Sequence, residues 1–476
     1  MAAGTSGTGG TAGDLAIVLH SHMPYVEGFG TYPFGEEWLF DAVIRSYLPL
    51  LEVARDLTVT VTPVLADQLE DRDAATRLRQ FLREWRIGAA EADLRDVPAD
   101  LQPAVHSELT RYERALELLD AAAGDPLRPF RDAATAGRIA LAASSATHAV
   151  LPLVATRPGL RLQLDAGLRS HRRRFGWDGG FWLPECAYAP GLERALAEAG
   201  VAWFCVDQSA HLADPLDALA PIATAAGPVA LPIDWEAISW LWALDGYPSD
   251  PAYAQFDGKS LRGMRLWRIG GGAYDPEAAA AAARRQAEEF LAAVAARLRR
   301  YAESRGRRGL LVFAIDTELL GHWWSEGPLW LRAVLDGAAA AGVRTLDVPT
   351  ALAEHEPLER PLHASTWGAG KDFRSWDSPP VADLAWAARR LELRLLRALG
   401  AGLRGDAAAR AARELLAAQA SDWAFLDSRG QAGDYPFVRA TDHGEALLQA
   451  IESRSDTDPR MRSLAPDLSV ASLLEP

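Results

Sequence analysis

Several apolar stretches of this chain end in residues that can carry acid–base or nucleophilic chemistry. LAIVLH ends in His20, FWLPE ends in Glu185 and LLVFAID ends in Asp316. Two further stretches, RIALAASSATH and VAWFCVD, end in His148 and Asp207. Two facing carboxylates are the minimal equipment for cleaving a glycosidic bond, because one is ionised while the other donates a proton. The acidic stretch ends therefore predict a site for sugar chemistry.

Spacing alone does not select the two carboxylates, but their surroundings favour a pair. Glu185 lies close to Trp182, and Asp316 is soon followed by the sequence GHWW. Apolar, indole-rich surroundings raise the pKa of a carboxyl group and give a sugar ring a face to stack on. We therefore favour Glu185 and Asp316. The full set of candidates is Glu185, Asp207, Asp234, Asp316, Glu318 and Glu326.

The histidines admit three interpretations. His20, His22 and His148, together with an aspartate, would be a credible metal-binding set, because zinc sites use three or four such ligands. Neutral imidazoles could instead form hydrogen bonds with sugar hydroxyls. Each histidine could also be a satisfied core residue. The residue pattern by itself leaves these alternatives open.

The elements that would position these residues alternate between strands and helices up to about residue 350. This alternation predicts either a doubly wound sheet or a (β/α) barrel. A doubly wound nucleotide-binding fold would show a glycine-rich turn after its first strand, whereas SHMPYV follows here. Chemistry at the ends of many strands favours the barrel. Residues 215–232 are predicted to be a Pro/Ala/Gly-rich loop, and 381–419 a helical hairpin.

Composition excludes several classes of protein. The 476 residues have a net charge of -15, which disfavours nucleic acid and anionic membrane surfaces as partners. No stretch has the length of unbroken apolar residues that a membrane span needs. Two cysteines, Cys186 and Cys205, are too few for a disulfide framework and fit a reducing cytoplasm. The 16 tryptophans exceed the 10 tyrosines and 14 phenylalanines, which favours stacking on sugars.

Five ordered segments resemble the motifs of family 57 of the glycoside hydrolases. They are HSHMPYV (20–26), ATHAVLPL (146–153), GFWLPECAYAPGLE (180–193), FAIDTELLGHWWSEGP (313–328) and STWGAGKDFRSW (365–376). Three more segments resemble its α-1,4-glucan branching enzymes in particular. These are EEWLFDAVIRSYLPLL (36–51), GYPSDPAYAQF (246–256) and ASDWAFL (420–426).

The resemblance implies an α/β fold, a (β/α)7 TIM-like barrel with a helical insertion and a C-terminal helical domain. The expected organisation is a disordered tail at 1–13, a barrel at 14–355 with an insertion at about 66–130 and an active-site loop at 208–265, and a helical domain at 356–476. The implied reaction is retaining transglycosylation on α-glucan chains in the cytoplasm, without a metal or organic cofactor.

The resemblance also implies roles for individual residues. Glu185 matches the nucleophile and Asp316 the general acid/base. His20, His22 and His148 match positions that line the donor sugar site, which disfavours the metal interpretation. The other expected glucan contacts are Arg262, Trp267, His322, Trp323, Trp367, Trp376, Asp422, Trp423 and Gln431.

The chain departs from the family pattern at several points. Ala149 stands where glycine is usual, and Ile233-Asp234 replaces an expected Arg-Asp pair. Residues 208–238 contain no tyrosine, although the family usually has one there that shields the intermediate from water. A weak lid predicts a larger share of hydrolysis. The alternative functions are therefore an α-amylase or 4-α-glucanotransferase of the same family, and more remotely a decayed glucan-binding protein or a metal-dependent deacetylase.

Overall fold

The computed structural model describes residues 11–32, 34–453 and 463–474. At its centre lies a sheet in which seven neighbouring strands run parallel. In spatial order these are β7 (Val229–Pro232), β5 (Trp203–Val206), β4 (Gly180–Trp182), β3 (Ile139–Ser144), β2 (Leu57–Val61), β1 (Gly13–Ser21) and β8 (Leu310–Asp316). All nine residues of β1 are buried, as expected for a strand covered on both faces.

The two end strands of this series meet at a seam. The backbone N–H of Asp234, just after β7, donates a hydrogen bond to the carbonyl of Val312 in β8 (2.8 Å). The Asp234 carboxylate pairs with Arg297 of α11 at the same place (2.7 Å). The two end strands therefore meet through this contact and not through a paired ladder, and the predicted (β/α)7 architecture is confirmed.

Short strands extend the sheet beyond the barrel. β6 (Ile222–Ala223) pairs with β7 in the antiparallel sense, and β10 (Leu358–Glu359) pairs with β6. β9 (Val343–Thr345) pairs with β1. β10 lies after residue 355, where we expected the barrel to end.

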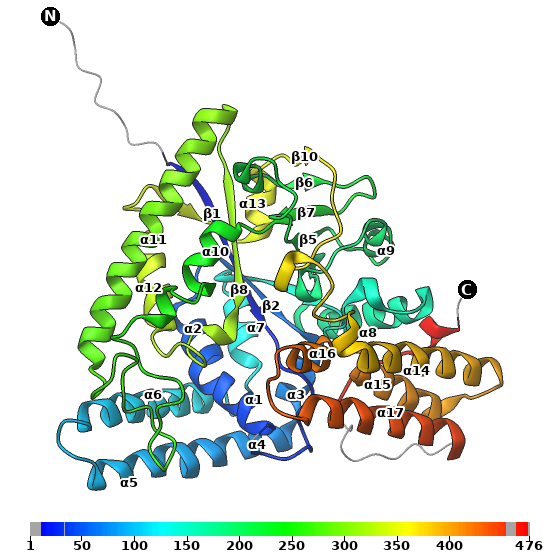
Figure 1. The fold of residues 1–476 in the computed structure, drawn as a ribbon, viewed down its shortest axis with the longest axis horizontal. Helices are drawn as coiled ribbons and strands as arrows, with labels where there is room; N and C mark the ends of the chain where they lie inside the picture. The colour runs from blue at the N-terminus through cyan, green and yellow to red at the C-terminus, as the bar shows by residue number, and fades with distance from the viewer. Residues whose placement is uncertain (1–10, 33, 454–462, 475–476) are drawn as a thin grey trace, which may run out of the picture.

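Helices cover the outside of the barrel (Figure 1). The long helix α11 and α12 pack along one side, next to β8 and β1. The helices of the barrel and its flanks are α1 (Glu36–Ala42), α2 (Leu48–Val53), α3 (Pro63–Glu70), α7 (Arg128–Thr135), α8 (Arg157–Phe175), α9 (Leu192–Glu198), α10 (Trp235–Trp242), α11 (Pro276–Arg305), α12 (Gly327–Gly337) and α13 (Val348–Glu354). A π-helical turn, Val43–Tyr47, joins α1 to α2.

Local sequence explains where these helices begin and end. α8 begins after Thr156, whose side chain accepts a hydrogen bond from the N–H of Gly159, and it ends at Gly176, which has a left-handed backbone. The carboxylate of Asp275 caps α11 in the same manner, and Gly306 ends that helix.

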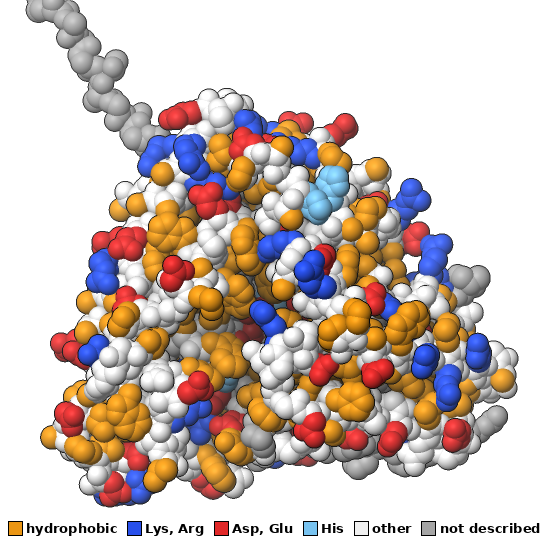
Figure 2. Space-filling view, in the orientation of Figure 1, with side chains coloured by type: hydrophobic (Ala, Val, Ile, Leu, Met, Phe, Trp, Pro, Cys, Tyr) orange, Lys and Arg blue, Asp and Glu red, His pale blue; other side chains and the backbone are white. Residues whose placement is uncertain are grey.

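Two helical additions flank the barrel (Figure 1). The first consists of α4 (Arg72–Phe81), a π-helical segment Leu82–Ile87, α5 (Gly88–Asp96) and α6 (Gln102–Ala121). The second, called here the C-terminal helices, consists of α14 (Ala382–Gly400), α15 (Gly405–Ala418), α16 (Ser421–Ser428) and α17 (Tyr435–Ser453). The C-terminal helices share an apolar core with Leu162 and Ala166 of α8. Figure 2 shows a hollow on the face where the two additions approach each other.

Two predictions about the chain's organisation were wrong. The predicted tail was too long, because Gly13 already belongs to β1 and Ala12 binds the carbonyl of Gly342; residues 1–10 lie outside the described residues. The predicted loop at 215–232 contains β6 and β7. β7 has only four residues and ends in Pro232, so its sequence resembles a turn.

Candidate active site

The ends of β1, β2 and β8 bring His20 next to Asp316. These two residues are partners in the register of β1 and β8. His20 forms a hydrogen bond through Nδ1 with Thr60 Oγ1 of β2 (2.6 Å) and through Nε2 with His148 Nε2 (2.9 Å). Its ring also stacks on Trp182, with 4.5 Å between the ring centroids. His20 therefore links the carboxyl end of β8 to the loop after β3.

Glu185 lies just after β4, in a single 3-10 turn, Pro184–Cys186. Its carboxylate accepts two hydrogen bonds: Oε2 from Trp367 Nε1 (2.9 Å) and Oε1 from the hydroxyl of Ser421 (2.7 Å). Nδ1 of His148 lies 3.6 Å from the same Oε1 atom. The Glu185 side chain is thus held at a fixed position from three separate parts of the chain.

The backbone at this point has an uncommon conformation. Glu185 (φ 61°), Cys186 (φ 49°) and His148 (φ 59°) all adopt left-handed conformations without being glycine. Such conformations cost of order 1–3 kcal/mol each and concentrate at functional sites. Here they turn the side chains of Glu185 and His148 toward the same place.

The two favoured carboxyl groups differ in their electrostatics. Burial raises the pKa of Glu185, but the hydrogen bonds from Trp367 and Ser421 oppose that rise. Burial raises the pKa of Asp316 well above its usual value, and the charges of Glu318 and Glu185 raise it further. A carboxyl pair with unequal surroundings fits one ionised and one protonated group.

A third carboxyl group, Glu318, belongs to the same cluster. It accepts hydrogen bonds from the hydroxyl of Tyr47 and from the backbone N–H of His22 (3.0 Å). Burial raises the pKa of Glu318 to about 7 although these hydrogen bonds oppose the rise. Its charge state therefore bears directly on Asp316.

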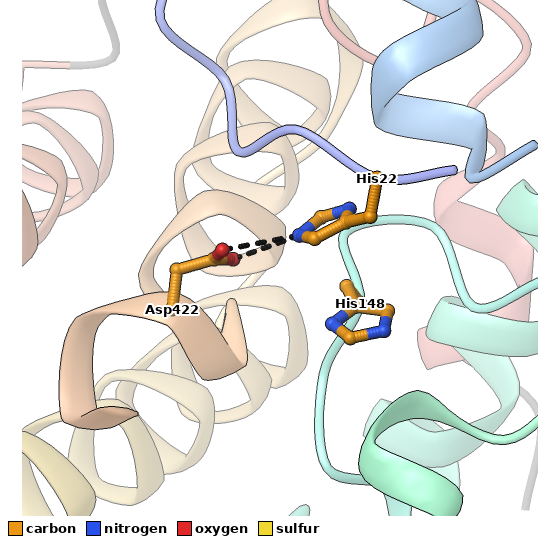
Figure 3. A group of neighbouring side chains, drawn as sticks. All are labelled: His22, His148 and Asp422. Atoms are coloured by element: carbon orange, nitrogen blue, oxygen red, sulfur yellow. Dashed lines mark hydrogen bonds and ion pairs between the residues drawn. The ribbon is translucent and has the colours of Figure 1, made fainter. Parts of the chain in front are cut away.

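His22 connects the barrel to the C-terminal helices (Figure 3). Its Nε2 lies 3.1 Å from both carboxylate oxygens of Asp422, and its Nδ1 binds Thr62 Oγ1 (3.0 Å). Burial lowers the pKa of His22, but Asp422 more than compensates, so the pKa is raised. In contrast, burial holds the pKa values of His20 and His148 well below their usual range.

One potential ligand atom from each of His22, His148 and Asp422 lies within 4.8 Å of the other two, and these are residue types that bind metals (Figure 3). Both ring nitrogens of each histidine already have a polar partner, however. His148 Nδ1 binds the hydroxyl of Ser421 (2.9 Å), and its Nε2 binds His20. The three imidazoles are therefore already joined in a hydrogen-bond network, and their contacts with a donor sugar stay a prediction.

Of the aromatic residues predicted to bind glucan, the structure brings Trp367 and Trp323 to the cluster. Trp367 binds Glu185 and packs against Trp182, with 5.1 Å between the centroids. The N–H of Trp323 binds the carbonyl of Glu318 (3.0 Å), and its half-exposed ring packs on Phe256 (4.7 Å).

Other predicted glucan contacts lie in different surroundings. Trp376 and Trp423 are buried and line a cavity of about 70 Å³ between the barrel and the C-terminal helices. His322 is buried, Trp267 is half-buried and Gln431 is exposed. Arg262 pairs with Asp93 (2.7 Å) and Asp96 (2.6 Å) of α5. Among the described residues, no hydrogen bond, ion pair or ring contact joins these residues to Glu185 or Asp316, so their glucan contacts stay predictions.

The remaining candidate carboxylates have structural partners. Asp207 binds Lys371 (2.7 Å), and Asp234 binds Arg297 at the seam of the barrel. Glu326 accepts a hydrogen bond from the N–H of Ala254 (3.1 Å). We therefore interpret these three acids as structural residues.

Sequence reasoning missed Ser421, Thr60 and Thr62 as site residues. The sequence did offer a signal for Ser421, because this residue precedes Asp422 in the quoted segment ASDWAFL. Thr60 and Thr62 occupy β2 and its end, and nothing in the sequence separates them from other strand threonines.

Comparisons with known proteins identify the family to which the sequence is similar. The sequence model of glycosyl hydrolase family 57 matches residues 16–358, and that of the C-terminal part of 1,4-alpha-glucan branching enzymes matches residues 385–465. A 1,4-alpha-glucan branching enzyme of Thermococcus kodakarensis is 33% identical over 90% of this chain and 72% of its own length. A probable 1,4-alpha-glucan branching enzyme of Mycobacterium tuberculosis is 34% identical over 94% of both chains.

Solved structures give the same result. The family 57 branching enzyme of Pyrococcus horikoshii superposes with a TM-score of 0.89 at 29% identity over 97% of both chains. The alpha-amylase AmyC of Thermotoga maritima has a TM-score of 0.85 at 24% identity, over 98% of this chain and 99% of its own, which establishes a common fold. From its matched sequence, its relatives and its fold, we conclude that the chain belongs to glycosyl hydrolase family 57.

Proposed function

We propose that this chain carries out the reaction for which its branching-enzyme relatives are named, with Glu185 as nucleophile and Asp316 as general acid/base. The enzyme cleaves an α-1,4 bond of a glucan donor and forms an α-1,6 branch on an acceptor chain. The observation that carries this assignment is the unequal carboxyl pair. Glu185 accepts two hydrogen bonds that stabilise its charge, whereas the buried Asp316 receives only destabilising charges from its acidic neighbours.

The first half of the reaction transfers the donor to the protein. Glu185 attacks the anomeric carbon, the bond to the 4-oxygen breaks, and Asp316 gives its proton to that oxygen. In the second half, Asp316 removes the proton from the 6-hydroxyl of the acceptor, which displaces Glu185 from the anomeric carbon. Two inversions give net retention of the α configuration.

The imidazoles around Glu185 fit the binding of the donor sugar. Neutral His20 and His148 can donate or accept hydrogen bonds, and the pair of His22 with Asp422 supplies a charged partner for a hydroxyl. The half-exposed ring of Trp323, next to Glu318, offers an aromatic face for a chain at the mouth of the site.

Branching competes with hydrolysis at the second step, because water can replace the acceptor. The match of residues 385–465 to the C-terminal part of branching enzymes favours branching. The absence of tyrosine from residues 208–238 favours a measurable share of hydrolysis. A paired assay on amylose separates the two. Branching lowers iodine absorbance and creates α-1,6 linkages with few new reducing ends, whereas hydrolysis raises reducing ends in step with lost colour.

Variants of the carboxyl pair test the assigned roles. Glu185→Gln should lower kcat by about 10⁴-fold or more, because the covalent step is lost. Asp316→Ala should lose about 10² to 10⁴-fold on amylose, yet stay active in forming the intermediate from α-maltosyl fluoride, whose leaving group needs no proton. Azide should then rescue Asp316→Ala and yield an α-glycosyl azide.

The same experiment can contradict the assignment. A β-glycosyl azide from Asp316→Ala would indicate that Asp316 is the nucleophile, so the two roles would be exchanged. Full activity of Glu185→Gln on the fluoride would show that Glu185 is not the nucleophile. In the paired assay on amylose, a fall in iodine absorbance with few new reducing ends and no α-1,6 signal would make 4-α-glucanotransferase the better description.

We also propose that the enzyme works in the cytoplasm as an enzyme of α-glucan chains. Cys186 and Cys205 are free and buried, which fits a reducing compartment. In the described part of the chain, no helix combines the length and apolar character needed to cross a bilayer.

A further inference from the structure

Trp367 contacts Glu185 through both its backbone and its side chain. The N–H of Trp367 donates to the carbonyl of Glu185 (2.9 Å), and the indole Nε1 donates to the carboxylate (2.9 Å). Trp367 lies in a loop between β10 and α14, outside the seven barrel strands. The indole can therefore stay in place only if other contacts hold this loop against the barrel.

Lys371 lies four residues further along this loop and makes a buried ion pair. Its ammonium Nζ lies 2.7 Å from Oδ2 of Asp207, which follows β5, and it rests 2.8 Å from the ring centroid of Trp235. The Asp207 side chain is completely buried and that of Lys371 is 17% exposed. Lysine is rare here, since the sequence contains only Lys259 and Lys371 among its 49 basic residues.

Asp207 also has a neighbour that holds the same loop. The amide of Gln208 donates to the carbonyl of His363 (2.9 Å) and to the hydroxyl of Ser365 (2.8 Å). Its oxygen accepts from the N–H of His363 (2.9 Å). Asp207 and Gln208 together fix both sides of the segment that carries Trp367.

A tight turn couples Lys371 to Trp367. The N–H of Lys371 donates to the carbonyl of Gly368 (3.0 Å), and that of Thr366 donates to the carbonyl of Lys371 (3.2 Å). The backbone of Lys371 is left-handed (φ 57°), a strained conformation that the side-chain contacts must hold. Movement of Lys371 therefore moves Trp367.

We propose that Lys371 is a positioning residue, whose ion pair with Asp207 holds the indole of Trp367 on the carboxylate of Glu185. The proposal rests on the assigned role of Glu185 as nucleophile. Lys371 acts at a distance from the substrate, through the turn and the indole. Its loss should slow formation of the glycosyl-enzyme more than it weakens binding of the glucan.

The pH profile reports this positioning. The hydrogen bond from Trp367 lowers the pKa of Glu185 against the effect of burial, so its loss raises that pKa. Because Glu185 must be ionised to attack, the acid limb of kcat/KM then moves to higher pH. The other titratable groups whose charges act on Glu185 are His22, His148, Asp316, Asp422 and Cys186, and the ion-pair variants replace none of them. Of these five, Cys186 also feels the charges of Lys371 and Asp207, but burial keeps the pKa of its thiol well above the usual value.

The experiment uses Lys371→Met in the full chain, with α-maltosyl fluoride as donor so that proton donation does not limit the rate. We expect kcat to fall about 10- to 100-fold while KM changes less than about twofold. The acid limb should move upward by about half a pH unit. Lys371→Arg, which keeps a cation, should restore most of kcat and the position of the limb.

Arg374→Met is the matched control. Arg374 lies in the same loop, but its side chain is 64% exposed and pairs with Asp372 two residues away. This variant should keep the parent's kcat and pH profile. If Lys371→Met proves too unstable to purify, Lys371→Met/Asp207→Asn removes both buried charges and should show the same kinetic changes.

A double-variant cycle tests whether Lys371 acts through Trp367. Trp367→Phe alone should reproduce the lower kcat and the shifted limb, and adding Lys371→Met should change little more. Additive losses, or a folded Lys371→Met with the parent's kcat and pH profile, would overturn the proposal. Full activity of Glu185→Gln on the fluoride would instead overturn the nucleophile assignment, so the two failures are distinguishable.

Discussion

At the scale of single residues, the proposed active site contains strained backbone that its own side chains help to hold. His148 and Glu185 are both left-handed and both contact Ser421, which binds Glu185 Oε1 and His148 Nδ1. The hydrogen bond from Ser421 replaces a water contact that the Glu185 carboxylate loses when it is buried. The positions of the proposed nucleophile and its neighbouring histidine are therefore held by contacts between segments far apart in the sequence.

Glu318 should tune the protonation of Asp316. Its negative charge raises the pKa of Asp316, so replacing it with neutral, isosteric Gln should lower that pKa. The alkaline limb of the pH profile on amylose marks the loss of the Asp316 proton, and it should move down by about one pH unit in Glu318→Gln.

Measuring kcat/KM between pH 5 and 9 checks this expectation. Arg374→Met serves as the control, because it also changes one charge but lies on the exposed part of another loop. An alkaline limb that stays in place in Glu318→Gln, or moves upward, would contradict the role of Asp316 as the acid.

At this scale the sequence predicted the pair of carboxylates and the three histidines, because each follows an apolar strand and carries a reactive group. It could not separate aromatic residues that face a ligand from those in the core. Trp376 and Trp423 have the same chemistry as Trp367, yet they are 3% and 2% exposed. Only the packing of the C-terminal helices decides which indole remains at the site.

At the scale of elements, the seam between β7 and β8 is a point of concentrated stability. Asp234 is fully buried there, and burial raises the pKa of its carboxyl group. The ion pair with Arg297 opposes that rise and compensates part of the cost of burial. Arg297→Met leaves that carboxylate unpaired and should lower the free energy of unfolding by about 3–5 kcal/mol.

The loss in Arg297→Met should depend on pH. A carboxyl group whose pKa is raised by folding binds a proton more tightly in the folded state, so it destabilises the fold increasingly as pH rises above its unfolded pKa. Without Arg297 that pKa rises further, and the deficit should be larger at pH 7 than at pH 5. Urea unfolding at both pH values measures this.

Arg300→Met is the control for the seam. Arg300 lies on the same helix, and its 60% exposed side chain reaches Glu236 only at 4.0 Å. It should cost less than about 1 kcal/mol. An equal loss from both variants at both pH values would show that the seam is not a special point of closure.

Most elements were predictable from hydrophobic pattern and capping residues. The helix at 157–175 and the strands that end in His20 and Asp316 agree with the structure. β7 was not predictable, because four residues ending in proline have no periodicity to read. Its place in the barrel comes from pairing with β5, a contact that the sequence does not display.

At the scale of the whole molecule, the C-terminal helices supply residues to the proposed catalytic centre. α16 begins with Ser421, whose hydroxyl binds Glu185, and continues with Asp422, which pairs with His22. Ser421→Ala should lower kcat by about 10- to 100-fold, because a hydrogen bond to a charged carboxylate is lost. The pKa of Glu185 should rise, which moves the acid limb to higher pH.

Ser428→Ala is the matched control at the other end of the same helix. Its hydroxyl is exposed and binds only the carbonyl of Phe425 among the described residues (2.8 Å). We expect the parent's kcat and acid limb from this variant, measured on α-maltosyl fluoride. Equal kinetics of Ser421→Ala and Ser428→Ala would separate the C-terminal helices from the chemistry.

The residues of the proposed catalytic centre are spread along the chain, so they are translated at different times during synthesis. His22 leaves the ribosome early, but its partner Asp422 and the serine that binds Glu185 are translated after the whole barrel. Because domains begin to fold as they emerge, the barrel can assemble while its nucleophile still lacks one of its two hydrogen bonds. We therefore expect a nascent chain to reach its full activity toward glucan only when α16 docks.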